Sequence, residues 1–163
     1  MHTNRRLNHF FCPVLLSLAF LFLLSPRLLL STEHKGWEAG SKYNSYYDYK
    51  EMDKLKGNIK KFKKVVPLPG MEPATAFILE EGDEEILVHL CPQSFADAKE
   101  TGLRRGIKTK VKGSWAYINE KDVFMASKVK QGEHFEFKVR LTKDGTPFWT
   151  MTAEKLAREK VNQ

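Results

Sequence analysis

The stretch that decides the fold runs from Asn58 to Pro92 and reads NIKKFKKVVPLPGMEPATAFILEEGDEEILVHLCP. It opens with a basic, β-rich run in which both faces mix lysine with apolar side chains, so a bulge is expected. The segment 67–73 then predicts a loop, because its three prolines remove three backbone donors. Two apolar runs follow on either side of Glu81-Gly82-Asp83-Glu84, where Gly82 is free to take the positive φ of a tight turn. The stretch therefore predicts a strand, a loop and a hairpin, which together open a small β-barrel.

Strand signals continue toward the C-terminus after one short helix. Ser94 to Thr101 predicts that helix, with Ser94 as its N-cap and Gly102 at its end. Lysine alternates with Ile107, Thr109 and Val111 over 107–112, residues 123–129 predict another strand, and the period of 2 is cleanest over 135–142. The side chains expected to face the barrel interior are Phe135, Phe137, Val139, Leu141, Val111 and Ile86. Residues 152–161 predict a short charged helix.

Five or six antiparallel strands, one short helix between the third and fourth long strands and no repeated unit predict an all-β fold with minor α content. This is the arrangement of a small barrel like the oligonucleotide/oligosaccharide-binding (OB) fold. We expect the barrel to occupy residues 57–150 and a charged helix or tail to occupy 151–163. Residues 32–56 mix glycine, serine and tyrosine without a useful period, so they are interpreted as a linker.

Residues 1–31 predict a targeting segment, because Arg5 and Arg6 precede a long apolar run and no acid occurs among them. Two interpretations stay open, a cleaved signal peptide and an uncleaved transmembrane helix. Residues 10–30 are long enough to cross a hydrocarbon core of about 30 Å, and no clean Ala-x-Ala cleavage site follows them. In both cases the domain is expected to be exported. We expect it at the inner membrane on the periplasmic or outer side, or free in the periplasm if the leader is cleaved.

Charge and cysteine content restrict the function only loosely. Without the leader, which holds three of the 27 basic residues and none of the 20 acids, the chain carries 24 − 20 = +4. Such a mildly basic domain is compatible with anionic lipid or nucleic acid and requires neither. Cys12 lies in the apolar run and Cys91 in the domain, so no disulfide is expected between them. No Cys-x-x-Cys-His pattern occurs.

His89 and Cys91 are the first tentative ligand-binding residues. At positions i and i+2 of a strand they share one face, but two ligands complete only half of a tetrahedral site, so no metal site is predicted. The alternative is a structural histidine and a small buried thiol. Catalysis would require paired carboxylates in a pocket or a nucleophile beside a base. Neither pattern is found, so we expect a protein that is not an enzyme and has no cofactor.

A basic stripe is the second tentative site. Lysines of the first strand, Arg104 and Arg105 are expected to join Lys108, Lys110 and Lys112, with Trp115 and Tyr117 as stacking surfaces, as in non-specific binding of single-stranded nucleic acid. Alternating lysine is equally typical of a solvated barrel exterior. The acids around Gly82 would also repel phosphate.

Three segments, 57–95, 103–116 and 141–150, resemble a family of small exported bacterial OB-like proteins. They carry a Pro/Gly loop, Val-His-Leu-x-Pro, Val-x-Gly-Ser and Asp-Gly-x-Pro-x-Trp patterns. The chain departs from that family at Cys91, where glycine is usual, and at Gln93-Ser94, where an aromatic often stands. The resemblance implies the fold and the exported location but no reaction. Two hypotheses therefore remain: a non-catalytic accessory module that binds a protein partner or small ligand, and a single-stranded nucleic-acid binder.

Overall fold

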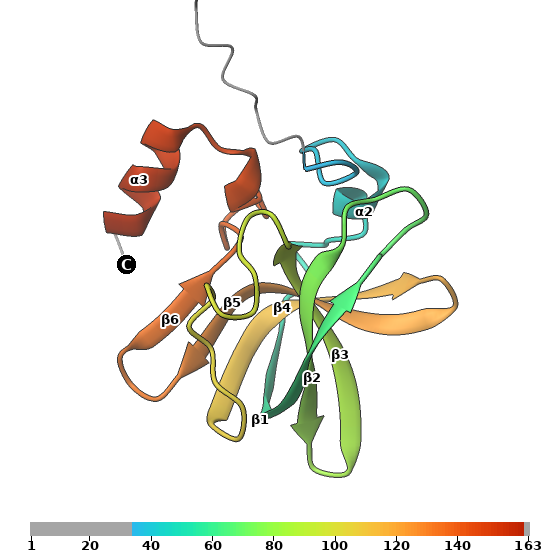
Figure 1. The fold of residues 1–163 in the computed structure, drawn as a ribbon, viewed down its shortest axis with the longest axis vertical. Helices are drawn as coiled ribbons and strands as arrows, with labels where there is room; N and C mark the ends of the chain where they lie inside the picture. The colour runs from blue at the N-terminus through green and yellow to red at the C-terminus, as the bar shows by residue number, and fades with distance from the viewer. Residues whose placement is uncertain (1–33, 162–163) are drawn as a thin grey trace, which may run out of the picture. The chain divides into compact units, whose positions relative to one another are not determined.

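The computed structural model describes residues 34–161, and the predicted targeting segment lies outside this range. The elements are α2 (Lys42–Ser45), β1 (Asp53–Val65), β2 (Ala74–Glu81), β3 (Glu84–Pro92), β4 (Lys108–Ile118), β5 (Lys121–Gln131), β6 (Phe135–Lys138), the 3₁₀ turn η2 (Phe148–Thr150) and α3 (Ala153–Val161) (Figure 1). Within residues 34–161, no helix is long and apolar enough to cross a membrane.

Five of the strands form a nearly closed ring. β1 pairs with β2 and β4, β2 pairs with β3, and β4 pairs with β5, all antiparallel. The ring closes where β3 meets β5 in parallel, through Val88 opposite Phe124 and His89 opposite Met125. β6 adds to β5 outside the ring. The prediction of an all-β, OB-like antiparallel barrel is confirmed.

The bulge and the tight turn predicted in the first three strands are also present. The pairing of β1 with β2 skips Lys60, which is the extra residue of the expected bulge. The β2–β3 hairpin turns at Gly82 and Asp83, and Gly82 has φ +63°. Near Gly57, β1 passes from β4 to β2, and a Cβ there would lie 1.9 Å from the carbonyl oxygen of Glu80. Only glycine fits at that crossing.

Four of the six residues predicted to face inward are buried, namely Ile86, Val111, Val139 and Leu141. The prediction is wrong for Phe135, whose side chain is 38% exposed, and Phe137 is only half-buried against the core. The reason is that β6 lies outside the ring and stops at Lys138. The amides of Val139 and Arg140 then both donate to the carbonyl of Ser127, at 2.8 and 3.0 Å, so the alternation does not continue to residue 142.

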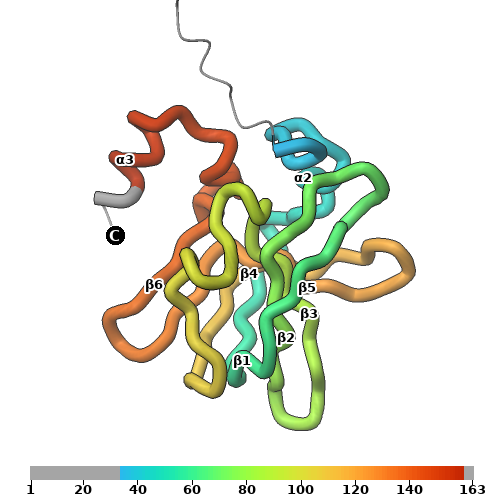
Figure 2. The backbone as a smooth tube through the Cα atoms, in the orientation of Figure 1, coloured from blue at the N-terminus to red at the C-terminus, as the bar shows by residue number. Residues whose placement is uncertain are grey.

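The helix predicted over Ser94–Thr101 is not formed. Asp97, rather than Ser94, accepts hydrogen bonds from the following amides, those of Lys99 (2.7 Å) and Glu100 (2.9 Å). A single turn follows, from the Thr101 amide to the Asp97 carbonyl at 3.1 Å. Gly102 then takes φ +69°, which leaves too few residues for a helix. Figure 2 shows this β3–β4 connection as an irregular loop. The charged C-terminal helix is present as α3.

Residues 34–52, predicted as part of a linker, pack against the barrel. Trp37 is fully buried. Its ring meets Tyr43 and Trp149 edge-on, with centroids 4.5 and 5.4 Å apart, and its Nε1 donates to the carbonyl of Glu72 at 2.9 Å. The aromatic residues do not recur at a regular spacing in the sequence, and α2 has only four residues. No periodic pattern therefore predicts this packing. We call Trp37, Tyr43, Tyr47 and Trp149 the aromatic cap.

A buried cation lies in the aromatic cap. The guanidinium carbon of Arg140 is 4.6 Å from the ring centroid of Tyr47 and 4.8 Å from that of Trp149. Its Nη2 donates to Asn44 Oδ1 at 2.7 Å and its Nη1 to the carbonyl of Gly145 at 3.3 Å. Burial lowers the pKa of Arg140 to about 10, so the group remains charged at pH 7. Arg140 thereby joins the N-terminal segment to the C-terminal part of the domain.

Candidate functional site: a lysine-lined slot

Three strands of the barrel carry the same short pattern, an apolar residue between two lysines. It reads Lys-Leu-Lys at 54–56 on β1, Lys-Val-Lys at 110–112 on β4 and Lys-Val-Lys at 128–130 on β5. The apolar residues Leu55, Val111 and Val129 are buried in the core. Since side chains alternate along a strand, the flanking lysines of all three strands point to the outside of the barrel.

The strand register brings these lysines directly opposite one another. Lys112 lies between Lys54 on β1 and Lys128 on β5, which forms one row. The second row consists of Lys56, Lys110 and Lys130. On β6, Lys138 extends the first row and Glu136 lies at the end of the second. Because like charges directly opposite each other destabilise a sheet, folding stability does not explain this arrangement.

The two rows enclose a hollow of about 340 Å³. Its lining residues are Lys54, Leu55, Lys56, Lys110, Val111, Lys112, Lys128 and Lys130. The side chains of Leu55 and Val111 are buried, so these residues contribute mainly backbone to the floor, while lysine side chains form both walls. We call this hollow the lysine slot.

Positive charge in the lysine slot is only partly neutralised. Glu136 lies 2.8 Å from Lys130, 3.4 Å from Lys128 and 3.3 Å from Lys138. Among the described residues, no carboxylate forms an ion pair with the other four lysines, which are Lys54, Lys56, Lys110 and Lys112. The slot therefore offers many ammonium donors and few acceptors, which suits an anionic ligand.

The structure separates the lysines and the aromatics that the sequence grouped together. Lys110 and Lys112 line the slot, and Lys108 lies on the same side of β4, opposite Asn58. Trp115 and Tyr117 follow Gly113 and Ser114, which are both buried, so the alternation of exposed and buried residues changes phase there, and neither aromatic lines the slot. The expected combination of basic stripe and stacking surface is not formed.

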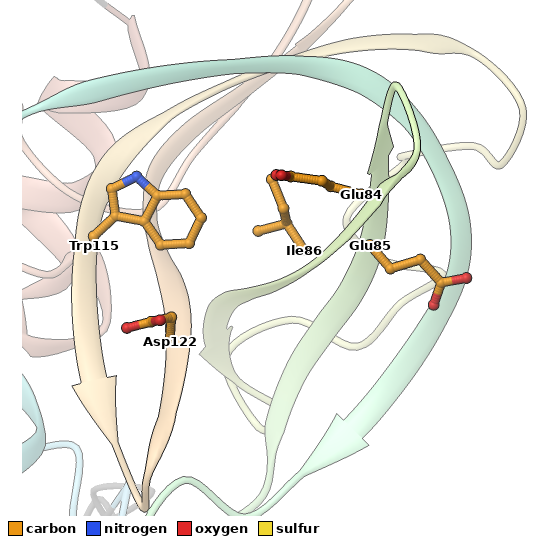
Figure 3. Close-up of a pocket in the computed structure, with 5 residues that line it drawn as sticks. All are labelled: Glu84, Glu85, Ile86, Trp115 and Asp122. Carbon is orange, nitrogen blue, oxygen red and sulfur yellow. The ribbon is translucent and has the colours of Figure 1, made fainter.

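Trp115 instead lines an acidic pocket of about 600 Å³ with Glu84, Glu85, Ile86 and Asp122. Figure 3 shows Trp115 and Asp122 on one hairpin, with Ile86 and Glu84 across the opening. The ring of Trp115 meets Phe124 edge-on at 5.2 Å, and its Nε1 donates to Asp53 at 3.2 Å. Carboxylates around this aromatic surface would repel a phosphate backbone.

His89 and Cys91 are both buried and have separate partners. His89 Nδ1 is hydrogen-bonded to the Tyr43 hydroxyl at 3.1 Å, while the Cys91 thiol donates to the carbonyl of Ala96 at 3.6 Å. The β2–β3 register skips Leu90, so the alternation that would put them on one face is interrupted. Burial lowers the pKa of His89 to about 4 and raises that of the Cys91 thiol. At neutral pH both groups are therefore uncharged.

Sequence reasoning missed four of the six slot lysines. Lys54 and Lys56 lay in the segment interpreted as a linker, and Lys128 and Lys130 lay in a strand considered only for its apolar residues. The lysines expected from the first strand lie on the part of β1 that pairs with β2, away from the slot, and Lys60 binds Glu80 and Glu85. The usable signal was the repeated lysine–apolar–lysine pattern, found once on each of three strands.

The fold and the slot define a class, a small OB-like barrel with a concentrated basic face. A model of the MamS/MamX magnetosome protein family matches residues 51–136, more than half of the chain, and the protein belongs to that family. The matched range contains all six slot lysines. No curated protein matches the sequence.

Proposed function

We propose that this protein is a non-catalytic accessory module of the magnetosome, held at a membrane by its N-terminal segment, that binds an anionic partner through the lysine slot. The observation that supports the binding role is the pair of opposed lysine rows. An anionic ligand would relieve the repulsion between these rows, so its binding would be favoured by the same charges that weaken the empty sheet.

The membrane location rests on the apolar run at residues 10–30, and the association with the magnetosome rests on the description of the family. Fractionation of the source cells, followed by mass measurement of the mature N-terminus, tests it. We expect an uncleaved chain in the membrane fraction. A soluble product that begins near residues 31–35 would contradict the anchor and leave export intact.

The non-catalytic role rests on His89 and Cys91. Cys91 is fully buried and its thiol pKa is raised, so little thiolate is available as a nucleophile. His89 has the Tyr43 hydroxyl as its hydrogen-bond partner and is almost fully buried. These contacts give both side chains a structural role.

Single-stranded nucleic-acid binding is the second candidate, because the basic face belongs to an OB-like barrel. Two observations weigh against it. Neither Trp115 nor Tyr117 is among the residues that line the slot, so bases have no stacking platform in it. The β2–β3 hairpin, part of the face on which OB folds bind oligonucleotides, carries the acids Glu80, Glu81, Asp83, Glu84 and Glu85.

A titration of the full-length protein in nonionic detergent tests the binding role. The probes are an acidic peptide, anionic vesicles, polyphosphate and a single-stranded oligonucleotide, each at two salt concentrations. At least one probe should bind and weaken with salt, because neutralising the lysines releases counterions. The variant with Lys108, Lys110 and Lys112 changed to Glu should lose that binding. If no probe binds at low salt, the proposed function is wrong, and tighter binding of the oligonucleotide than of the base-free probes would favour the second candidate.

A further inference from the structure

We propose that the lysine slot binds an unbranched chain of phosphate groups without bases, of the inorganic polyphosphate class, lying across β1, β4 and β5 between the two lysine rows. This inference rests on the proposed anion-binding function and names its ligand class. The geometry, the donor content of the slot and its floor each support it.

The shape of the slot suits a linear ligand. Each row crosses neighbouring strands, which lie about 4.8 Å apart, so the row from Lys54 through Lys112 and Lys128 to Lys138 extends about 14 Å. The two rows stand two residues apart along the strands, or about 7 Å. A narrow ligand with charge repeated along its length can lie between them and meet ammonium groups on both sides.

The hydrogen-bonding groups of the slot also favour a phosphate chain. An ammonium group has three donors and no acceptor, so the lysine walls present donors, and the carboxylates bonded to slot residues include Glu136, beside Lys128 and Lys130, and Glu81, which accepts from the Lys56 amide at 2.8 Å. The floor is the backbone of Leu55 and Val111, which face each other within the β1–β4 ladder, so sheet pairing already occupies backbone groups there. A phosphate chain offers acceptors and needs none in return.

The same chemistry separates this ligand from other anions. An extended acidic peptide brings backbone N–H groups that would find few acceptors in the slot, and each unpaired buried donor is costly. A nucleic acid brings bases, and no aromatic residue lines the slot to stack on them. A flat bilayer touches the tips of the lysines but does not enter the hollow between the rows. Lipid headgroups nevertheless share the phosphate chemistry, so the experiment must separate the two sources.

The test uses the full-length protein in nonionic detergent and isothermal titration calorimetry. The probes are orthophosphate, tripolyphosphate and a long polyphosphate chain, compared at equal total phosphate. We expect affinity to rise with chain length, because only a longer chain meets both walls along the whole slot. Orthophosphate that binds as tightly as the long chain would overturn the inference.

Two double variants locate the binding. Lys110→Gln with Lys112→Gln removes one lysine from each row and should weaken binding of the long chain at least about 10-fold. It should also lower the slope of log affinity against log salt by about 2, or about 1 per lysine. The matched control is Lys61→Gln with Lys63→Gln, which has the same spacing and charge loss on an exposed part of β1 that pairs with β2. The control should change affinity less than about two-fold, and equal losses in the two variants would show charge attraction without a site.

Competition distinguishes the inference from the function on which it rests. Anionic vesicles, an acidic peptide and an oligonucleotide are each titrated against the long polyphosphate chain. If one of them binds through Lys110 and Lys112 more tightly than polyphosphate does, the ligand class is wrong while anion binding stands. If no anionic probe binds at all, both proposals fail. All slot lysines are on the surface, so an unchanged or slightly raised melting temperature should show that the variants fold.

Discussion

The lysine slot and the aromatic cap both contain cationic side chains, but these lie at the surface in the slot and are buried in the cap. In the cap, one cation, Arg140, is buried between two rings, and its guanidinium donates to Asn44 and Gly145. In the slot, six lysines stand opposite one another at the surface, and Glu136 is the acid that binds two of them. The cap uses charge to join distant parts of the chain, whereas the slot keeps charge available at a cost to stability. Of the two regions, the slot is the one at which we propose that an anionic ligand binds.

The largest effect should come from breaking the cap. Trp37→Ala removes a fully buried ring and its hydrogen bond to Glu72, so we expect a loss of about 3–5 kcal/mol in the free energy of unfolding. Chemical denaturation measures it. Trp115→Ala is the control, because that ring is 43% exposed and lies outside the cap, so its loss should be smaller. An unchanged free energy of unfolding for Trp37→Ala would show that the packing of residues 34–52 does not stabilise the barrel.

Low pH should destabilise the folded protein through His89, whose ring is hydrogen-bonded to Tyr43 of the cap. Its pKa in the folded protein is about 4, below its ordinary value of 6.5, because burial disfavours the charged ring. Between these two values the unfolded chain binds more protons than the folded one, so stability falls as the pH decreases from about 6.5 toward 4. The loss should reach roughly 3 kcal/mol.

Thermal or chemical unfolding at a series of pH values measures this loss. In His89→Gln the part of the pH dependence that belongs to His89 should disappear, whatever the variant costs at pH 7. His134→Gln is the control, since the side chain of His134 is 96% exposed. Parallel pH profiles for the protein and His89→Gln would contradict the assignment.

The smallest effect, and of opposite sign, is expected in the slot. Lys112→Gln removes a charge that faces Lys54 on one side and Lys128 on the other, so it should stabilise the protein by about 0.2–1 kcal/mol at low salt. The gain should shrink in high salt, because exposed charges are screened. Lys64→Gln serves as the control, since Lys64 faces Thr75 rather than another lysine. A destabilised Lys112→Gln would mean that the slot lysines contribute to folding after all.

The sequence predicted what depends on near neighbours. The β2–β3 hairpin, its turn at Gly82 and the bulge at Lys60 all follow from patterns within a few residues, and all are present. The helix predicted after Ser94 is not formed, because Asp97 caps a single turn that ends at Gly102. The prediction that Phe135 faces inward is wrong because alternation alone does not show whether a strand belongs to the ring, and β6 lies beside the ring.

The candidate site was harder to predict, because it depends on pairing between distant segments. Lys54, Lys112 and Lys128 are neighbours only through the register of β1, β4 and β5, which a pattern within one strand does not specify. The cap is similar, since Trp37 and Trp149 stand 112 residues apart and yet the Nε1 of Trp149 donates to the carbonyl of Trp37. Period and composition describe faces of single strands, whereas both regions are assembled from several segments.

The short sixth strand also bears on how copies of the protein behave when they are concentrated. In the described part of the chain, β6 pairs with β5 along one edge and has no strand on the other. A long, flat, apolar edge would recruit another chain into a shared sheet. Here the edge ends after four residues, where two successive amides turn toward the carbonyl of Ser127, and it carries Glu136 and Lys138. Crowded copies should therefore remain separate barrels, and fibril growth from this edge should be slow.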